Sequence, residues 1–376
     1  MSTVPPILTG RHVAFLSWRD TTNPEGGGAE RYLEEVAEGL VARGATVTVF
    51  SARHADAHGT AVRNGVRYVY GGSKLSVYLH GMLALLRGRL GRPDVVIDVQ
   101  NGMPFFTRLV TRRPVIVLVH HIHREQWPIV YPGTAGRVGW WIERWLSPRL
   151  YRRARYVAVS HATKAELVAL GVDEHRVAVV HNGNDGPRPN VHPKTDHPSV
   201  CVVCRLVPHK QVEHAIDAVN QLREEFPDLE LTIVGSGWWQ AELEAYAART
   251  GAPAVFAGFV SETVKREIYE RSWVMALPSL KEGWGLVVGE AALAGTPTVA
   301  YRSAGGTQES IEHDYSGLLA DTREGFVEAL RVVLAEHDTR RRLAKGAQDV
   351  SSRFSWEHAR ASFAEAVRTA VEQGHP

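Results

Sequence analysis

The chain has 376 residues, of which 44% are hydrophobic and 22% are charged, a composition that excludes disordered, collagenous and coiled-coil proteins. At roughly 150 residues per domain, this length predicts two or three domains. Lys and Arg total 43 against 41 for Asp and Glu, so the net charge of +2 gives no reason to expect a nucleic-acid partner.

Purely aliphatic runs, such as Val115–Val119, are far shorter than the ~20 apolar residues that cross a bilayer. The start of the chain, MSTVPPILTGRHVAFLSW, lacks the basic region, long apolar stretch and small-residue cleavage site of a signal peptide. We therefore expect a cytoplasmic protein.

Short β-branched runs alternate with helical patterns along the first half of the chain. They predict strands at residues 12–16, 46–50, 95–97, 115–119, 156–159 and 177–180. After the first of these strands, apolar residues recur at the spacing of one helix face: Leu33, Val36, Ala37 and Leu40. Gly44 is expected to end that helix. Strands separated by helices are typical of an α/β fold with a parallel sheet.

A change of composition at residues 184–198, where Pro, Gly and polar residues dominate, predicts an interdomain linker. A second alternating series follows it, with strands expected at 200–206, 229–234, 254–256, 273–277 and 298–301. We expect an N-terminal domain at 1–185, a linker at 186–199 and a C-terminal domain at 200–356, with a final helix at 357–376 that packs back on the first domain. In such sheets ligands bind at the carboxyl ends of the strands.

The two cysteines of the chain, Cys201 and Cys204, have the C-x-x-C spacing of redox and zinc sites. They fall in an apolar β-like run, where side chains three positions apart point to opposite faces. We therefore interpret them as two buried core residues.

The most informative stretch, Pro278–Pro297, comes straight after a predicted strand. Glu282 lies in its glycine-containing loop, and Glu290 follows in a helix expected to begin near Leu286. Glycines let a ligand approach the main chain, and the N–H groups at a helix start favour a phosphate. Carboxylates accept hydrogen bonds from sugar hydroxyls. Spacing alone fits equally a solvated Glu282 and a Glu290 engaged in a surface ion pair.

This stretch resembles the Glu-x7-Glu signature of the retaining nucleotide-sugar glycosyltransferases of family 4. Further segments resemble that family's motifs in the expected order: Gly27-Gly28-Ala29-Glu30, His120, Ser160 with Lys164, Asn182-Gly183-Asn184-Asp185, Arg205 with Lys210, Gly235-Ser236-Gly237, Gly258-Phe259-Val260 and Phe354-Ser355-Trp356. The resemblance covers nearly the whole chain. It implies the GT-B fold, an α/β fold in which two Rossmann-like domains face each other across a deep cleft.

The resemblance also implies roles for single residues. His120 would contact the donor sugar, Glu282 would hold hydroxyls of that sugar, and Glu290 would hold the ribose. Arg205 and Lys210 would stabilise the leaving diphosphate, although a lone Arg or Lys is more often a solvated surface residue. The remaining expected donor contacts are Gly27, Gly28, Gly235, Gly237, Phe259, Val260, Gly283, Trp284, Gly285 and Leu286.

We expect no metal ion and no cofactor. Arg205 and Lys210 would stabilise the diphosphate in place of a divalent ion, and the sequence contains no Asp-x-Asp motif. The family supplies no agreed general base, and none is assigned. Two positions depart from its pattern. Gln211 stands where glycine is usual, which affects only the helix start. His121 stands where Asp is frequent, which puts the fine contacts to acceptor or sugar in doubt.

The expected reaction is retaining transfer of a hexosyl group from a UDP- or GDP-sugar to an acceptor hydroxyl, for instance of a lipid-linked or cell-envelope glycan. One alternative is an NAD-dependent oxidoreductase, which would need a complete G-x-G-x-x-G that neither glycine loop provides. The other is a catalytically silent protein that binds sugar nucleotides, which only a measurement of turnover separates from an enzyme.

Residues 137–155 mix three tryptophans with a cluster of arginines. A basic, aromatic amphipathic segment is typical of contact with an anionic membrane surface, and this would place the protein at the inner face of the membrane. The alternative is a helix whose aromatic face packs on the N-terminal sheet, with Pro148 interrupting the pattern.

Overall fold

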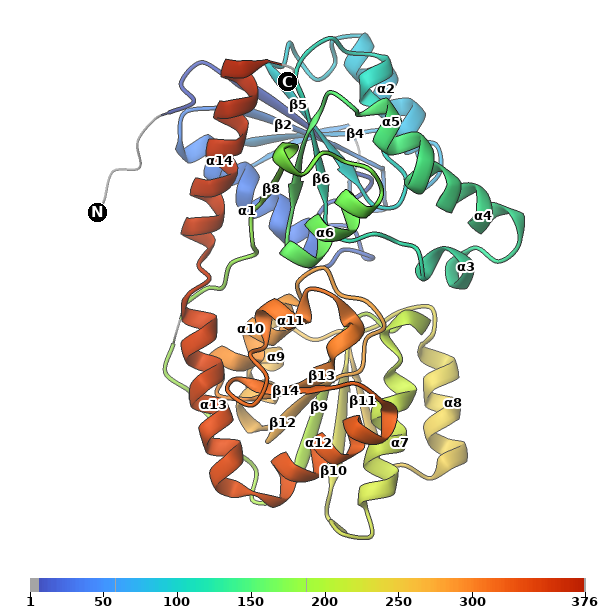
Figure 1. Cartoon of the computed structure of the whole chain (residues 1–376), viewed down its shortest axis with the longest axis vertical. Coiled ribbons are helices and arrows are strands. Elements are labelled where there is room, and N and C mark those ends of the chain that lie inside the picture. The colour runs from blue at the N-terminus through green and yellow to red at the C-terminus, as the bar shows by residue number, and fades with distance from the viewer. Residues whose placement is uncertain (1–6, 58, 187, 375–376) are drawn as a thin grey trace. The chain divides into compact units, whose positions relative to one another are not determined.

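The computed structural model divides the chain into two compact units, one of residues 1–183 with 356–376 and the other of residues 184–355 (Figure 1). It describes residues 7–57, 59–186 and 188–374. Each unit is an α/β domain built on its own largely parallel sheet, which confirms the fold class expected from the alternating strand and helix patterns.

Within the described residues, the first sheet has eight strands in the order β3-β4-β2-β1-β5-β6-β7-β8. Only the hairpin pair β3 and β4 is antiparallel. The strands are β1 (His12–Leu16), β2 (Thr46–Ser51), β3 (Thr60–Arg63), β4 (Val66–Tyr70), β5 (Val95–Gln100), β6 (Val115–Val119), β7 (Arg155–Ala158) and β8 (Val177–Val179). The hairpin has no counterpart in the sequence prediction.

The helices of the first unit are α1 (Gly28–Ala42), α2 (Val77–Leu86), α3 (Gln126–Val130), α4 (Thr134–Trp141), α5 (Ser147–Leu150), α6 (His161–Ala169) and α14 (Trp356–Gln373), with short 3-10 turns at Thr107–Leu109 and Glu174–Arg176. The predicted apolar face of α1 is fully buried. Gly44 adopts a left-handed φ of +90° just after it, a conformation that ends helices and suits glycine.

Helix α14, in red in Figure 1, packs on α1 within the first unit although more than 300 residues separate them in the sequence. Arg360 pairs with Glu35 at 2.6 Å, and Arg43 pairs with Glu357 at 2.7 Å. Gly39 lies at the crossing point, where an added Cβ would come within 2.6 Å of the Arg360 side chain. The chain therefore crosses to the second unit and returns to complete the first.

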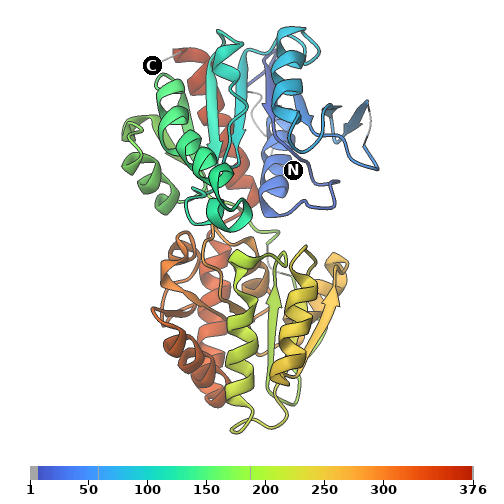
Figure 2. The same cartoon turned by 90° about the vertical axis from the view of Figure 1, so that its right-hand side faces the viewer.

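Within the described residues, the second sheet has six parallel strands in the order β11-β10-β9-β12-β13-β14. Figure 2 shows strands of this unit, coloured from yellow-green to red, flanked by helices. The chain starts in the middle, winds outward and then reverses, as in the doubly wound dinucleotide-binding fold. The strands are β9 (Ser199–Val203), β10 (Glu230–Val234), β11 (Ala254–Gly258), β12 (Val274–Leu277), β13 (Thr298–Tyr301) and β14 (Gly317–Ala320). Strand β14 was not predicted, and β9 ends three residues before the expected position.

The helices of the second unit are α7 (Val212–Leu222), α8 (Gln240–Thr250), α9 (Glu262–Arg271), α10 (Leu286–Leu293), α11 (Thr307–Ser310), α12 (Arg323–Ala335) and α13 (His337–Ser352), with 3-10 turns at Pro208–Lys210 and Arg302–Ala304. Apolar side chains from α7, α12 and the central strands form one core layer of this unit. A smaller core layer contains residues of α9 and α10.

The segment expected to be a linker is bound to the second unit. Lys194 donates to the carbonyl oxygen of Ser272 at 2.7 Å and to the hydroxyl of Thr296 at 2.6 Å. The main-chain amides of Val191 and His192 both donate to the carboxylate of Glu270 at 3.0 Å. Its polar composition thus reflects hydrogen bonding to the domain surface and not a free tether.

The two cysteines are free, as the strand interpretation predicts. Cys201 is buried in one core layer, while Cys204 packs against the other. Burial raises the pKa of the Cys201 thiol to about 11 and that of Cys204 to about 12. Burial therefore favours the neutral thiols, and the two residues face different core layers, as in the core interpretation.

The tryptophan-rich segment is one helical path through α4, a π turn at Ile142–Leu146 and α5. Pro148 does not break it, because the wider π turn precedes the residue that lacks an N–H. Trp140 packs on the core, whereas Trp141 and Trp145 are 54% and 43% exposed. Among the helices in the described ranges, none combines the length and apolar character needed to cross a membrane.

Candidate active site

Five loops follow successive strands at the carboxyl edge of the second sheet, and main-chain hydrogen bonds join neighbouring loops. In strand order the donors and acceptors are Gly235 to Gly258 (2.8 Å), Cys204 to Val234 (3.1 Å), Leu206 to Ser236 (2.9 Å), Leu280 to His209 (2.9 Å), Glu282 to Ala304 (2.7 Å) and Gly306 to Glu282 (3.0 Å). These main-chain bonds tie each loop to its neighbour. All the candidate donor residues of the second unit lie in or next to these loops.

The glycines of the β10 loop are required by close contact with the β9 loop. Gly235 has a φ of +124°, and a Cβ there would overlap the carbonyl oxygen of Cys204. A Cβ on Gly237 would overlap the carbonyl oxygen of Leu206. Arg205 lies between those two carbonyl groups in sequence, so the glycine loop fixes the main chain that carries Arg205.

Lys210 and Glu282 form an ion pair at this edge. The Lys210 Nζ lies 2.6 Å from Oε1 of Glu282, and both side chains are largely buried. Lys210 ends a 3-10 turn after β9, and Glu282 comes from the loop after β12. A partly buried, charge-assisted bond of this length is stronger than a surface pair, because solvent screens it less.

Glu290 lies in α10 and is held by α9. Its Oε2 accepts from Lys265 Nζ at 3.0 Å and from the Tyr269 hydroxyl at 3.2 Å. Burial alone would lower the pKa of Lys265, but Glu290 and Glu262 raise it above the ordinary value, so this lysine is charged. Of the non-functional alternative left open by spacing, the ion pair of Glu290 is present and orients the carboxylate, whereas Glu282 is not solvated but paired with Lys210 and 11% exposed.

The turn that leads into α10 presents its main chain at the sheet edge, while the ring of Trp284 lies in the core. Gly285 takes a left-handed φ of +84° directly before the helix. The Trp284 ring is buried edge-on against Phe354 with ring centroids 4.7 Å apart, so a ligand would meet the backbone of Gly283–Leu286. First-turn amides of a helix have no partner within the helix and suit an anion.

After β11, Phe259 is 86% exposed, while Val260 is half-buried against the core. Gly258 precedes them with a φ of +65° and accepts the hydrogen bond from Gly235. The exposed ring thus stands beside the glycine loop at the same edge.

In the first unit, His120 directly follows β6 at the carboxyl edge of the first sheet. The residue is 5% exposed, and its Nε2 has no hydrogen-bond partner among the residues that the structure describes. Its ring packs edge-to-face on Tyr32 with centroids 5.5 Å apart. Burial lowers the pKa of His120 to about 4, so the imidazole is neutral near pH 7.

The glycine loop of the first unit is held by a buried ion pair. The Gly27 amide donates to Oε2 of Glu30 at 2.7 Å, and Oε1 of Glu30 accepts from Arg19 Nε at 2.6 Å. Both charged side chains are buried. Gly28, the first residue of α1, is exposed next to this network.

The structure therefore gathers the predicted residues into two sets. Arg205, Lys210, Glu282, Glu290 and the residues of the loops at 235–237, 259–260 and 283–286 lie at the edge of the second sheet. His120, Gly27 and Gly28 lie at the carboxyl edge of the first.

Several residues that position these groups were missed by sequence reasoning. They are Arg19, which pairs with Glu30 beside Gly27, and Lys265 and Tyr269, which hold Glu290. A further buried carboxylate, Glu143, holds the segment that follows His120, because it accepts from the amide of His123 at 3.1 Å and from Trp127 Nε1 at 2.7 Å. Each acts through a partner 11 to 25 positions away, and no local periodicity signals such a pair.

Two family profiles together match most of the chain. The family described as Glycosyltransferase Family 4 matches residues 26–188, and the one described as Glycosyl transferases group 1 matches residues 187–350. The chain belongs to glycosyltransferase family 4. The enzymes of this family retain the anomeric configuration of the transferred sugar.

Two curated relatives show how similar this chain is to known glycosyltransferases. The D-inositol 3-phosphate glycosyltransferase of Xylanimonas cellulosilytica is 27% identical over 98% of this chain and 99% of its own length. The glycogen synthase of Mycobacterium tuberculosis is 29% identical over 65% of this chain and 63% of its own. The chain thus spans less than two thirds of the length of several family relatives that it matches.

Solved structures of glycosyltransferases share the fold. A sucrose-phosphate synthase from Thermosynechococcus elongatus superposes with a TM-score of 0.82 at 18% identity, covering 97% of this chain and 100% of that one. Anabaena HepE in complex with UDP-glucose superposes with a TM-score of 0.73 at 20% identity, covering 95% and 99%. At such identities these likenesses establish the GT-B fold of this family member and nothing finer.

Proposed function

We propose that the chain transfers a hexosyl group from a UDP- or GDP-sugar to an acceptor hydroxyl with retention of configuration. The observation that carries this proposal is the Lys210–Glu282 pair, which places a cation and a carboxylate 2.6 Å apart at the carboxyl edge of the second sheet. A cation binds the diphosphate of such a donor, and a carboxylate accepts hydrogen bonds from the hydroxyls of its sugar. A relative of the same fold has been crystallised with UDP-glucose, which supports a nucleotide-sugar donor.

In this proposal Lys210 bridges Glu282 and the donor diphosphate. Its ammonium group has three N–H donors, one of which is used by Glu282, and the others remain for phosphate oxygens. Arg205, placed by the glycine loop, supplies a second cation at the same edge. Two fixed cations stabilise the negative charge that develops on the leaving diphosphate, so the site would work without a metal ion.

The carboxylates hold hydroxyl groups of the donor. Glu282 has its second oxygen to accept from the sugar, while Glu290 uses Oε2 for Lys265 and Tyr269 and offers Oε1 to the ribose. The main-chain amides at 283–286 face the phosphates. Phe259 and the backbone of Val260 lie where the nucleobase would sit.

The reaction exchanges one bond to the anomeric carbon for another. The bond from that carbon to the phosphate oxygen breaks, the acceptor oxygen bonds to the same face, and the acceptor proton passes to the leaving phosphate. His120 takes part as a neutral imidazole, because burial keeps it unprotonated. It would hydrogen-bond the donor sugar through Nε2, and no residue of the chain is assigned as general base.

We further propose that the acceptor is lipid-linked and that the exposed face of α4, the π turn at Ile142–Leu146 and α5 contacts a membrane. Trp141 and Trp145 are exposed there, and Arg144 and Arg149 stack on Trp145 at 5.5 and 4.4 Å. Aromatic rings beside arginines suit the boundary between lipid headgroups and acyl chains. This contact would place the protein at the cytoplasmic face of the membrane.

The test of the donor is a thermal-shift series with UDP-, GDP-, ADP- and TDP-sugars and with NAD(H), first without metal and then with magnesium. The proposal expects stabilisation by a UDP- or GDP-sugar that magnesium does not alter. Stabilisation by NAD(H) alone would move the assignment to an oxidoreductase. Nucleotide-sugar binding with no turnover against any acceptor would indicate a silent binding protein.

A further inference from the structure

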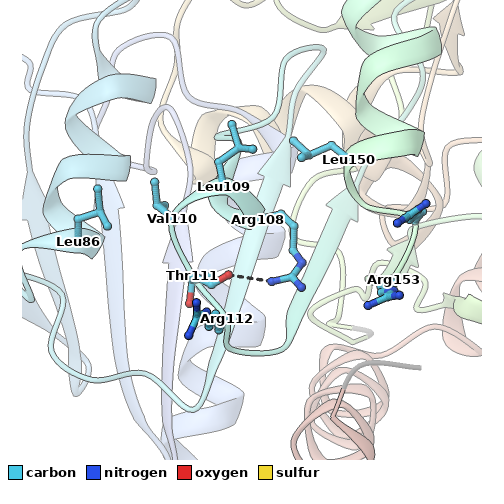
Figure 3. A pocket seen from close by; sticks show the side chains of 9 residues that line it. Leu86, Arg108, Leu109, Val110, Thr111, Arg112, Leu150 and Arg153 are labelled. Carbon is cyan, nitrogen blue, oxygen red and sulfur yellow. Dashed lines mark hydrogen bonds between the residues drawn. The ribbon is translucent and has the colours of Figure 1, made fainter.

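A pocket of about 530 Å³ opens on the first unit, away from the candidate donor residues and next to the C-terminal end of the 137–155 segment (Figure 3). It is lined by Leu86, Arg108, Leu109, Val110, Thr111, Arg112, Leu150, Arg152 and Arg153. Its residues precede β5, β6 and β7, so the pocket lies at the amino edge of the first sheet. His120 follows β6 at the other edge, one strand length or about 16 Å away.

The lining divides into an apolar and a basic side. Figure 3 shows Leu86, Leu109, Val110 and Leu150 along one side and the guanidinium groups of Arg108, Arg112 and Arg153 along the other. The described lining includes four arginines and no acidic side chain. Leu86 and Leu109 are strongly exposed, at 59% and 67%. Exposed leucines next to clustered arginines are unusual for a surface that faces only water.

Buried polar groups fix both walls of this pocket. The carboxylate of Asp98 in β5 accepts from the amide of Phe105 at 2.8 Å and from the Thr107 hydroxyl at 2.7 Å, and it also accepts from the Tyr151 hydroxyl. Thr107 begins the turn that carries Arg108, and Tyr151 precedes Arg152. One buried carboxylate therefore positions both arginine-bearing segments.

Further hydrogen bonds hold the arginines in place. Arg108 Nη1 donates to the carbonyl oxygen of Thr111 at 2.9 Å, which Figure 3 marks by a dashed line. Arg176 donates to the carbonyl oxygens of Tyr151, Arg152 and Ala154, closing the turn that presents Arg152 and Arg153. Positioning of this kind reduces the conformational entropy that a ligand must remove on binding.

We infer that this pocket binds a phosphate ester that carries an apolar group. Arginine forks match phosphate oxygens in geometry and charge, and the leucine side offers a surface for the apolar part. The volume falls in the range of pockets that enclose a whole small ligand and exceeds what an inorganic ion would fill. The ester can come from a lipid headgroup in a bilayer, which would extend the membrane contact proposed above, or from a water-soluble molecule.

The test uses the full chain and a double variant, Arg108→Ala with Arg153→Ala. A matched control, Arg249→Ala with Arg341→Ala, removes two exposed arginines from the second unit and leaves the same net charge. One arm measures co-sedimentation with phosphatidylcholine vesicles that contain phosphatidylglycerol, and with vesicles that lack it. The other arm titrates hexyl phosphate, a soluble phosphate ester with an apolar chain, by calorimetry. Unfolding midpoints check that each variant is folded.

A lipid source predicts binding to the anionic vesicles that falls about thirtyfold in the double variant, roughly fivefold for each arginine, and is unchanged in the control. In that case Leu109→Ser also weakens vesicle binding. A soluble source predicts that hexyl phosphate binds, that the double variant abolishes this binding and Leu109→Ser weakens it, and that the anionic vesicles do not bind. The inference is overturned if neither probe binds, or if both double variants lose binding equally.

The donor assignment is tested separately in the same samples. Thermal stabilisation by the nucleotide sugar should be the same in the wild type and in the Arg108→Ala, Arg153→Ala variant. Failure of the donor to stabilise any of these proteins would count against the proposed transfer reaction and leave the pocket assignment standing.

Discussion

In the second unit the loops that carry candidate residues are bonded to one another through main-chain groups, whereas in the first unit buried side chains hold the corresponding loops. The glycine loop at 235–237 meets the β9 loop through main-chain carbonyl and amide groups. The glycine loop at 26–28 depends on Glu30 and its partner Arg19. The two glycine motifs look alike in the sequence, yet they tolerate change differently.

The difference arises from how much each type of contact constrains the side chains. Close contact between main chains requires only that no Cβ lies between them. Such contact is therefore visible in the sequence as neighbouring glycines. A buried ion pair requires two particular side chains at positions that the tertiary fold alone brings together. Sequence patterns therefore report the first kind of support and not the second.

The largest effect is expected on the side-chain-supported loop. Glu30→Ala removes the partner of a buried arginine and the acceptor of the Gly27 amide, so the free energy of unfolding should fall by about 3–4 kcal/mol. Denaturant unfolding of Arg19→Ala, Glu30→Ala and the double variant measures this. A double variant that loses the sum of the two single losses would show that the pair is not coupled.

Next in size is the main-chain-supported loop. Gly235→Ala forces a left-handed conformation on alanine and drives its Cβ into the carbonyl of Cys204, which should cost about 3 kcal/mol and weaken donor binding as the Arg205 loop moves. The matched control is Gly251→Ala, where φ is +66° but no atom lies within 4 Å of the new Cβ. That change should cost only about 1 kcal/mol. Equal losses in both would refute the role of close contact.

The pH dependence of stability tests the buried state of His120. Its pKa is about 4 in the folded chain and about 6.5 when unfolded, so between these values the unfolded chain binds a proton that the folded chain does not. The contribution is present above pH 6.5 and is lost as the pH falls through 4, amounting to about 3 kcal/mol. His120→Asn should lack this component, and identical pH profiles for the two proteins would contradict it.

The smallest effect concerns Gln211, which stands where the family resemblance leads one to expect glycine. It takes a left-handed φ of +49° at the start of α7, a conformation that glycine adopts without strain. Gln211→Gly should therefore raise the free energy of unfolding by about 0.5–1 kcal/mol. Thermal unfolding measures the change, and a lower melting temperature would show that the glutamine side chain stabilises the turn.

Much of the fold could be predicted from the sequence, because buried strands and amphipathic helices follow the same periodicities that the core requires. β1, β6 and β13 match their predicted limits, and the apolar face of α1 is buried as expected. The β3–β4 hairpin was missed because its edge strand, Thr60–Arg63, is exposed and only weakly apolar. The hydrogen bonds of the 186–199 segment could not be predicted, because those from Val191 to Glu270 and from Lys194 to Ser272 and Thr296 leave no periodic pattern.

For the candidate site, residues that follow strands, such as Glu282 and Lys210, could be predicted from the sequence, because apolar runs show where strands end. It could not supply their pairing, which depends on two loops that are 72 positions apart. The pocket at the amino edge of the first sheet could not be predicted from the sequence for the same reason. Its arginines and leucines come from α2, the 107–112 segment and the turn after α5, and only the folded sheet assembles them.

The most direct test of the central claim is turnover of the preferred nucleotide sugar by the wild type, Lys210→Ala and the exposed-lysine control Lys345→Ala. Loss of one cation from a leaving-group site should lower the rate by about 10²- to 10³-fold, while the control keeps the wild-type rate. A Lys210→Ala variant that folds and turns over at a near-normal rate would contradict the assignment of the active site to the carboxyl edge of the second sheet.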